Sequence, residues 1–218
     1  MPRTITVKGI GRVTTKPDFI IISMSLESCD KEYDKAMEFA AENNRRLIES
    51  LVDAGFEKDS VKTTNFNVRT NYNHEKDGNG NFHKEFAGYV VNHQLKVGFD
   101  LDIERLSIAL SAISNCQSHP QIKISFTVKD ATALNEEMLR SATANARRKA
   151  EILCEASGVT LSDLIAIDYN WRELDIYSNT HYDMTEECLK APRGGLSVEI
   201  DPEDIDIRDT ATFVWEIK

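Results

Sequence analysis

The chain has 218 residues, of which 41% are hydrophobic and 28% charged, with a formal net charge of −10 at pH 7. This is enough apolar sequence to bury a core, and it excludes a disordered chain. The negative charge opposes nucleic acid and anionic lipid, and no stretch reaches the roughly 18 apolar residues of a membrane helix. We therefore predict no nucleic-acid partner and no transmembrane segment.

The first expected elements are strands. Residues 4–8 alternate, and a bulge or tight bend is expected at Gly9 and Gly11. Residues 19–28 begin as a continuous apolar run and end in alternation, which predicts a long central strand. The opening of the chain leads directly into a strand pattern, without the long apolar stretch of a signal peptide. For the chain as given we expect a cytoplasmic location.

A helix follows, with Asp30 as its expected N-cap and Gly55 as its stop. Its apolar face recurs at spacings of three and four residues: Ala36, Ala40, Asn43, Leu47 and Leu51. Strand patterns at 61–72 and 86–99 then flank the turn-rich residues 73–84, which predicts a long hairpin.

A second helix is expected over 102–114 and a strand over 122–128. The third helix, over 131–157, is the longest, and its small residues would let it approach a sheet closely. Its expected inward stripe is Met138, Ala142, Ala146, Ala150, Leu153 and Ser157. Strands are expected at 164–169 and 210–217, and residues 173–196 between them are expected to form an irregular surface excursion.

The order β-α-β-β-α-β over residues 19–129 predicts a ferredoxin-like core. The predicted fold class is α+β, with a mostly antiparallel sheet packed by helices. The core is extended by the long third helix and the C-terminal strands. We predict a single domain over 1–218, with its extension at 130–218.

The glycines and histidines are the first candidates for a phosphate-binding or metal-binding site. Gly9-x-Gly11 is followed by a strand, whereas a phosphate loop requires a helix N-terminus after its glycines. Of the five histidines, two flank the hairpin loop near acidic residues, where a loose surface metal site is conceivable but solvated loop side chains are favoured. The residues in question are His74, His83, His93, His119 and His181, with Glu75, Asp77 and Glu85.

The four cysteines are far apart and form no C-x-x-C pair, which favours thiols in a reducing compartment. None has a neighbour that would activate a nucleophile: Cys116 follows a helix C-terminus, Cys188 follows two glutamates, Cys154 lies beside a buried stripe, and Cys29 closes a strand.

Clusters of charge are interpreted as solvated surfaces. The basic run 147–149 lies among glutamates of the third helix. The acidic cluster lacks the ligand order of a calcium loop and comprises Asp201, Glu203, Asp204, Asp206 and Asp209. We therefore predict no catalytic residue, no cofactor-binding residue, no metal ligand, no cofactor and no enzymatic activity.

Several short motifs keep an order and spacing along nearly the whole chain. They are Val7-x-Gly9-x-Gly11, Pro17-Asp18, Thr63, Gly88-Tyr89, Ala142-x-x-x-Ala146-x-x-Lys149-Ala150, Gly158 and Ile200-x-Pro202-x-x-Ile205. Together they resemble the SIMPL-domain family (DUF541). The resemblance implies a bacterial protein, related to envelope and secreted proteins and to some cytoplasmic ones. Some members are linked to oxidative-stress defence, and some form ring-like or channel-like oligomers. It implies no reaction and transfers no catalytic residue.

Two hypotheses on function stay open. The first is a non-catalytic assembly or binding protein of undefined biochemical role. The second is a small-molecule or metal-handling protein whose site forms at a cleft or subunit contact. We predict a homo-oligomer, because aromatic residues and a methionine punctuate the hairpin tip and the excursion, and such residues are enriched at interface cores. They are Tyr72, Phe82, Phe86, Trp171, Tyr177, Tyr182 and Met184.

Overall fold

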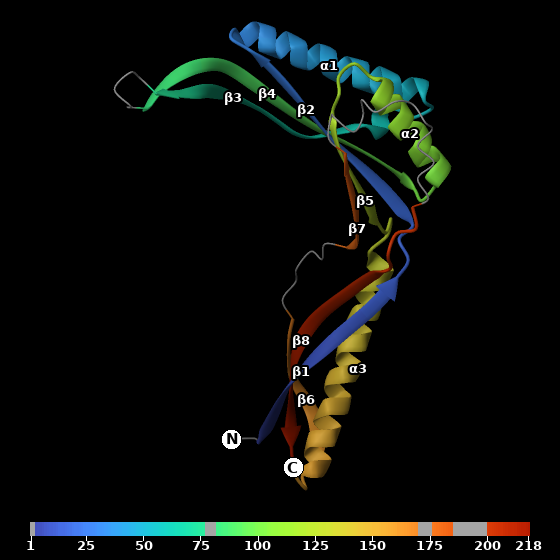
Figure 1. Ribbon diagram of the computed structural model, residues 1–218. Coiled ribbons are helices and arrows are strands. Elements are labelled where there is room, and N and C mark those ends of the chain that lie inside the picture. Colours follow the sequence, from blue (N-terminus) through green and yellow to red (C-terminus); the bar gives the residue numbers. More distant parts are fainter. Residues whose placement is uncertain (1–2, 77–81, 170–175, 185–199) are drawn as a thin grey trace. The chain divides into compact units, whose positions relative to one another are not determined.

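The structure of the protein is a computed structural model. It describes residues 3–76, 82–169, 176–184 and 200–218, without the side chains of residues 74–76, 82, 83 and 184. Contacts divide the chain into two compact units (Figure 1). Unit 1 comprises residues 1–18, 127–179 and 202–218, and unit 2 comprises residues 19–126 and 180–201. The prediction of a single domain over 1–218 stays a prediction.

Unit 2 contains a five-stranded sheet of order β3-β4-β2-β5-β7. Its first four strands and two helices give the predicted ferredoxin-like arrangement, and the α+β fold class is confirmed. The pairs β2–β4 and β3–β4 are antiparallel. The elements are β2 (Phe19–Asp30), α1 (Tyr33–Asp53), a 3₁₀ turn (Lys58–Ser60), β3 (Lys62–Lys76), β4 (Phe82–Asp100), α2 (Ile103–Asn115), β5 (Gln121–Thr127) and β7 (Tyr177–Met184).

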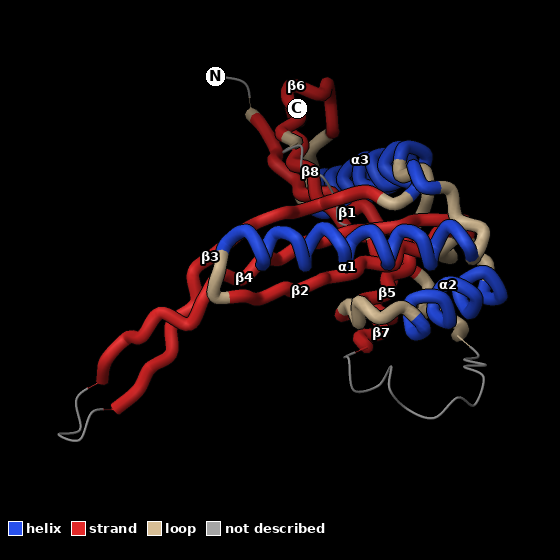
Figure 2. The backbone as a smooth tube through the Cα atoms, turned by 90° about the horizontal axis from the view of Figure 1, so that it is seen from above, coloured by secondary structure: helices blue, strands red, loops and turns tan. Residues whose placement is uncertain are grey.

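Both helices of unit 2 cover one face of this sheet (Figure 2). Alternate residues of β2 and β4 point toward the helices and are buried, as period-two patterning requires. The buried faces of α1 and α2 supply Leu47, Leu51, Leu106, Leu110 and Ile113 to the same core. Gly55 ends the first helix with a φ of +90°, as predicted. Asp30 is not the N-cap, which is Glu32.

Unit 1 contains the sheet β1-β8-β6 and the long helix α3. Both sheet pairs are antiparallel. The helix packs mainly on β1, where Val7, Ala146, Ala150, Phe213 and Trp215 share one apolar cluster. The elements are β1 (Thr4–Thr15), α3 (Thr132–Ala156), β6 (Leu161–Asp168) and β8 (Ile205–Ile217).

Three further local predictions are wrong. No bulge or bend interrupts β1 at Gly9 and Gly11, because β1 pairs with β8 in unbroken register from Thr4 to Thr15. The excursion at 173–196 contains a strand, β7. In α3 the buried stripe ends with Cys154, whereas Leu153 is half exposed and Ser157 is exposed at the helix end.

Candidate functional site

The contact between α3 and β1 explains the two glycines of β1. A Cβ atom at Gly9 would collide with the carbonyl oxygen of Ala142 and lie 2.8 Å from the Cβ of Ala146. A Cβ at Gly11 would collide with the carbonyl oxygen of Met138. These glycines let a helix backbone touch a strand backbone. They are structural, and they are followed by strands and not by a helix N-terminus.

The same helix covers the outer edge of β1 with polar side chains. Asn145 Oδ1 accepts a hydrogen bond from the backbone N–H of Ile10 at 3.1 Å. Ser141 Oγ accepts from the N–H of Arg12 at 3.3 Å, and Lys149 Nζ donates to the carbonyl of Lys8 at 3.1 Å. These groups would otherwise offer a template to another strand, so this edge of the sheet is closed.

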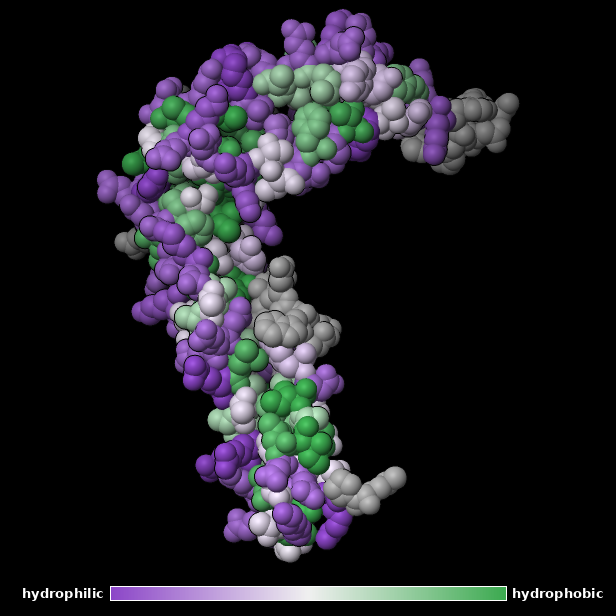
Figure 3. Space-filling model, turned by 180° about the vertical axis from the view of Figure 1, so that it is seen from behind, coloured by the Kyte–Doolittle hydropathy of each residue, from purple (hydrophilic) through white to green (hydrophobic). Residues whose placement is uncertain are grey.

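The other edge of the sheet is β6, and no described strand pairs with its outer side. Three of its apolar side chains, those of Leu164, Ile165 and Ile167, are 47–55% exposed. The strand has no lysine, arginine or proline, which are residues that commonly protect edge strands. Apolar side chains gather on the surface of unit 1 in Figure 3.

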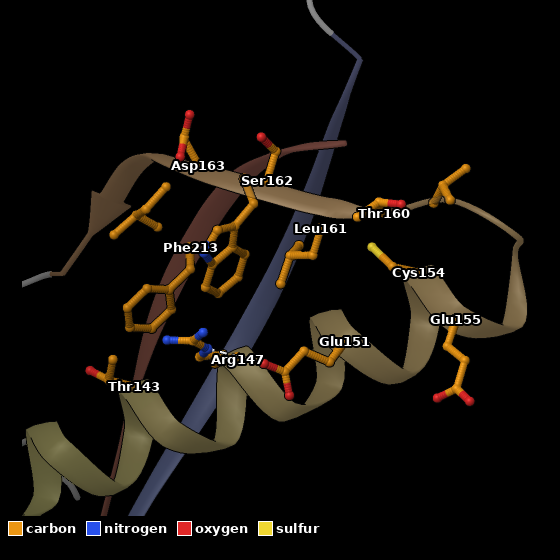
Figure 4. A pocket seen from close by; sticks show the side chains of 13 residues that line it. Thr143, Arg147, Glu151, Cys154, Glu155, Thr160, Leu161, Ser162, Asp163 and Phe213 are labelled. Carbon is orange, nitrogen blue, oxygen red and sulfur yellow. Dashed lines mark hydrogen bonds and ion pairs between the residues drawn. The ribbon is translucent and has the colours of Figure 1, made fainter. Parts of the chain in front are cut away.

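An open groove of about 580 Å³ lies between α3 and β6 (Figure 4). It exists because α3 covers β1 and part of β8 but barely reaches β6. Leu161 points from β6 into it (Figure 4). Phe213 and Trp215 also line the groove, and their rings stack with centroids 5.5 Å apart. On the helix side Arg147 pairs with Glu151 at 3.0 Å. The groove thus combines an apolar floor with a charged rim.

A second exposed apolar feature lies on the hairpin of β3 and β4. β2 ends at Asp30, opposite Tyr89, whereas β3 and β4 stay paired beyond it to Lys76 and Phe82. The outer part is therefore a two-stranded ribbon, which projects from the sheet of unit 2 in Figure 2. The predicted long hairpin is present.

Aromatic rings form a ladder along one face of this ribbon. Tyr33 contacts Tyr89, Tyr89 contacts Phe86, and Phe86 contacts Tyr72, with centroids 5.3–5.9 Å apart. The ladder continues from the apolar cluster that α1 covers at Val91 and extends past the first turn of the helix. Tyr72 and Phe86 are consequently 45% and 42% exposed.

Unit 2 also has a hollow of about 330 Å³ on its sheet, with a lining that includes the apolar residues Met24, Leu95 and Ile122. Hydroxyl, amide and ammonium groups line it, including Ser23, Ser25, Gln94, Gln121 and Lys123. Such groups can donate and accept hydrogen bonds to a small polar molecule.

The histidines are not brought together. Backbone pairing places His74 opposite Lys84 and His83 opposite Glu75, and the side chains of both histidines lie outside the described residues. His119 and His181 are exposed. Within the described part of the chain, no three histidine, cysteine or acidic side chains are grouped as metal ligands would be. Asp77 lies outside that part.

His93 is buried in β4 and contacts residues of β3. Its Nε2 lies 2.9 Å from Thr63 Oγ1, and its ring meets Phe66 edge to face. Burial lowers the pKa of His93, so the neutral form is favoured.

The three described cysteines are free thiols, and Cys188 lies outside the described residues. Cys116 is buried at the C-cap of α2, and Cys154 is buried in α3. Partial burial and the neighbouring Glu27 carboxylate raise the pKa of the Cys29 thiol. That shift disfavours the thiolate that a nucleophile needs.

Some residues of the two charged clusters are paired or hydrogen-bonded, and others are exposed to solvent. Asp206 is not a lone solvated carboxylate, because Arg12 and Arg208 each bond it at 2.9 Å and lower its pKa. Asp209 accepts a hydrogen bond from the N–H of Thr210. Asp201, Glu203 and Asp204 are exposed. In the basic run, Arg147 pairs with Glu151 and Lys149 bonds β1, while Arg148 is exposed.

The predicted contact aromatics divide into two groups. Tyr72, Phe86 and Tyr177 are exposed, whereas Tyr182 packs against the core of unit 2 beside Phe126. Trp171 and the side chains of Phe82 and Met184 lie outside the described residues. Sequence reasoning did not identify the open edge of β6, although its pattern Leu-Ile-Ala-Ile without a flanking cation was a signal for it.

The described helices include none that is long and apolar enough to span a membrane. A family model described as SIMPL, protein of unknown function (DUF541), matches residues 5–215. The chain is 25% identical over 166 residues to the 26 kDa periplasmic immunogenic protein of Brucella melitensis, and equally so to that of Brucella abortus. Each alignment covers 76% of this chain and 66% of the relative, which is just under two thirds of the relative's own length.

Proposed function

Since the chain belongs to the SIMPL family, whose function is unknown, we propose that it is a non-catalytic protein that acts by self-association. The observation that carries the proposal is the aromatic ladder on the ribbon of β3 and β4. A two-stranded ribbon is marginally stable alone in water, and this one displays half-exposed rings beyond the helix that covers their neighbours. A second copy that covered Tyr72 and Phe86 would bury apolar surface and stabilise the ribbon.

The non-catalytic part of the proposal is supported by the surroundings of the reactive side chains. Of the three described cysteines, two are buried and the third has a raised pKa, while burial lowers the pKa of His93, which is bonded to a threonine. A peroxidase assay tests this part. Turnover that a single cysteine substitution abolished would contradict it.

The self-association is tested by multi-angle light scattering of the full chain at micromolar concentration across a salt series. We expect a mass above that of one chain for the parent protein. The double variant Tyr72→Thr with Phe86→Thr should lower this mass, because threonine keeps strand propensity but removes the rings. A chain with residues 75–84 replaced by a short glycine-containing turn should show whether the tip is also required.

The matched control is Asn73→Thr with Glu85→Thr, one pair further along the ribbon and on its opposite face. Its mass should equal that of the parent protein. A parent protein that is a monomer at every salt concentration would refute the proposal. So would an equal loss of mass in the control.

A second candidate function is favoured by the hollow of unit 2 that Ser23 and Gln94 help to line. Its hydroxyl and amide groups suit a small polar ligand, and a thermal-shift screen of sugars and amino acids tests this. Stabilisation that Gln94→Ala removed would favour this function. The compartment is also a proposal: the Brucella relatives are named as periplasmic. A link to stress defence stays an implication of the resemblance.

A further inference from the structure

We propose that the outer edge of β6 and the adjoining groove bind an extended segment of another protein, rich in alternating apolar and basic residues, as an added strand. This inference goes beyond self-association and concerns unit 1, whereas the aromatic ladder lies in unit 2. Strand addition at a free sheet edge uses main-chain hydrogen bonds for affinity and side-chain pockets for selection.

The contrast between the two edges of one sheet is the first argument. On β1, α3 supplies Asn145, Ser141 and Lys149 to bond the outward backbone groups. On β6, no described strand pairs with the corresponding groups. One edge is thus closed by specific side chains while the other offers backbone donors and acceptors.

The side chains of β6 give the second argument. Leu164 pairs with Trp215 and Ile167 with Phe213, so both lie on the face that α3 covers, since Trp215 and Phe213 are buried there. A register irregularity between Leu164 and Ala166 keeps them in one row. Leu164 also lines the groove. An added strand could therefore place alternate apolar side chains against this row and into the groove.

The negative charge near β6 and the groove favours a partner with basic residues. The groove lining contains three carboxylates, Glu151, Glu155 and Asp163, and a single guanidinium, that of Arg147, which is paired with Glu151. Asp168 adds a further carboxylate at the end of β6. Asp163 and Asp168 adjoin Leu164 and Ile167 in β6, so their side chains point to the face away from α3, as Figure 4 shows for Asp163. The basic residues of an added strand, which alternate with its apolar residues, would lie on that same face, and cross-strand pairs of opposite charge are favourable.

In the register that aligns Leu164 of one strand with Ile167 of the other, the same charges disfavour a second copy of β6 as the occupant. In an antiparallel pair of two β6 strands, the register that places Leu164 opposite Ile167 also places Asp163 opposite Asp168, twice by symmetry. Like charges directly opposite each other destabilise strand pairing.

Fluorescence anisotropy with a labelled eight-residue peptide of alternating lysine and valine tests the proposal on the full chain. We expect saturable binding that weakens with salt. A peptide of alternating glutamate and valine should not bind, and proline at the central valines should weaken binding, because proline cannot donate to a ladder. Hydrogen exchange of the amides of residues 161–168 should slow when the lysine peptide binds.

Matched variants separate strand addition from general attraction to an acidic protein. Ile167→Lys in β6 and Ile10→Lys in β1 each add one positive charge at a half-exposed isoleucine, 55% and 46% exposed respectively. We expect Ile167→Lys to weaken binding of the lysine peptide by about tenfold or more. Ile10→Lys should change its affinity by about threefold at most, as a distant charge does.

Equal effects of the two lysine variants would overturn the proposal, as would equal binding of the glutamate peptide or no binding at all. A loss of oligomer mass in Ile167→Lys would instead show that a second copy occupies β6, and it would also overturn the proposal. Failure of self-association is a separate result, because the aromatic-ladder variants test it by mass alone and leave β6 unchanged.

Discussion

The substitution Gly9→Ala tests whether β1 and α3 are in backbone contact. The added Cβ would collide with the carbonyl oxygen of Ala142 and lie 2.8 Å from the Cβ of Ala146. Because a helix carbonyl cannot rotate away, the helix or the strand must shift. Overpacking of this kind costs about 1–3 kcal/mol.

A stabilising effect of alanine on the unfolded chain must be subtracted from this cost. Alanine restricts the unfolded chain more than glycine, which stabilises a protein by about 0.4–1 kcal/mol where the native conformation permits it. Since the obstacle is backbone, we take the upper half of the overpacking range and expect a net loss of about 1–2.5 kcal/mol. The matched control is Gly98→Ala, whose Cβ would lie 2.6 Å from the Phe19 ring, a side chain that can move. It should cost less.

Urea unfolding followed by tryptophan fluorescence measures the effect of Gly9→Ala in unit 1, and far-ultraviolet circular dichroism measures that of Gly98→Ala in unit 2. Trp215 packs with Ala146 in one cluster, so its emission reports on unit 1. We expect a lower midpoint for Gly9→Ala with an unchanged slope. A midpoint equal to or above that of the parent protein would refute the reasoning, because it would mean that space for a methyl group exists between β1 and α3.

Three further predictions concern packing, cysteine chemistry and pH. Ala146→Leu should overpack the helix–sheet contact and cost about 1–3 kcal/mol, and an unchanged melting temperature would mean that this face of α3 is solvated. Titration of the unfolded, unreduced chain should find four thiols, and two or none would reveal a disulfide. His93, whose pKa is lowered by burial, binds a proton less readily when folded than when unfolded, so stability should fall as pH drops below about 6.5. Urea midpoints from circular dichroism at several pH values should show this decline, and His93→Gln should flatten it; a steeper decline in the variant would contradict the assignment.

Periodicity in the sequence predicted the elements whose cores are amphipathic. The buried faces of α1 and α2 are those that the three- and four-residue spacings indicate, and the order of strands and helices in unit 2 follows from the same patterns. The assignment of Leu153 to the buried stripe was wrong, because the buried positions of α3 stay four residues apart and the position after Ala150 is Cys154. A spacing of three would have been equally compatible with a helix face.

Strand limits and contacts between distant residues were less predictable. Gly9 and Gly11 suggested a bend because glycine is flexible. The structure instead requires glycine at these positions because α3, more than 120 residues away in the sequence, touches β1 there. β7 was missed because Tyr177–Met184 is largely polar and lies at a sheet edge, where alternation is weak. The edge of β6 is open because β8 is the central strand of its sheet. Local sequence patterns do not predict this strand order.

The central strand of the unit 1 sheet is synthesised long after the first strand with which it pairs. β8 lies between β1 and β6, yet it pairs with β1 through contacts such as Thr15 with Ile205 that are 190 residues apart. At about 5–20 residues per second, a ribosome would make β8 about 10–40 seconds after β1. During that interval β1 lacks its partner β8, while residues 19–126, which form most of unit 2, are synthesised. A nascent chain would therefore need its first strand to be shielded, by its own α3 or by a chaperone, until β8 is made.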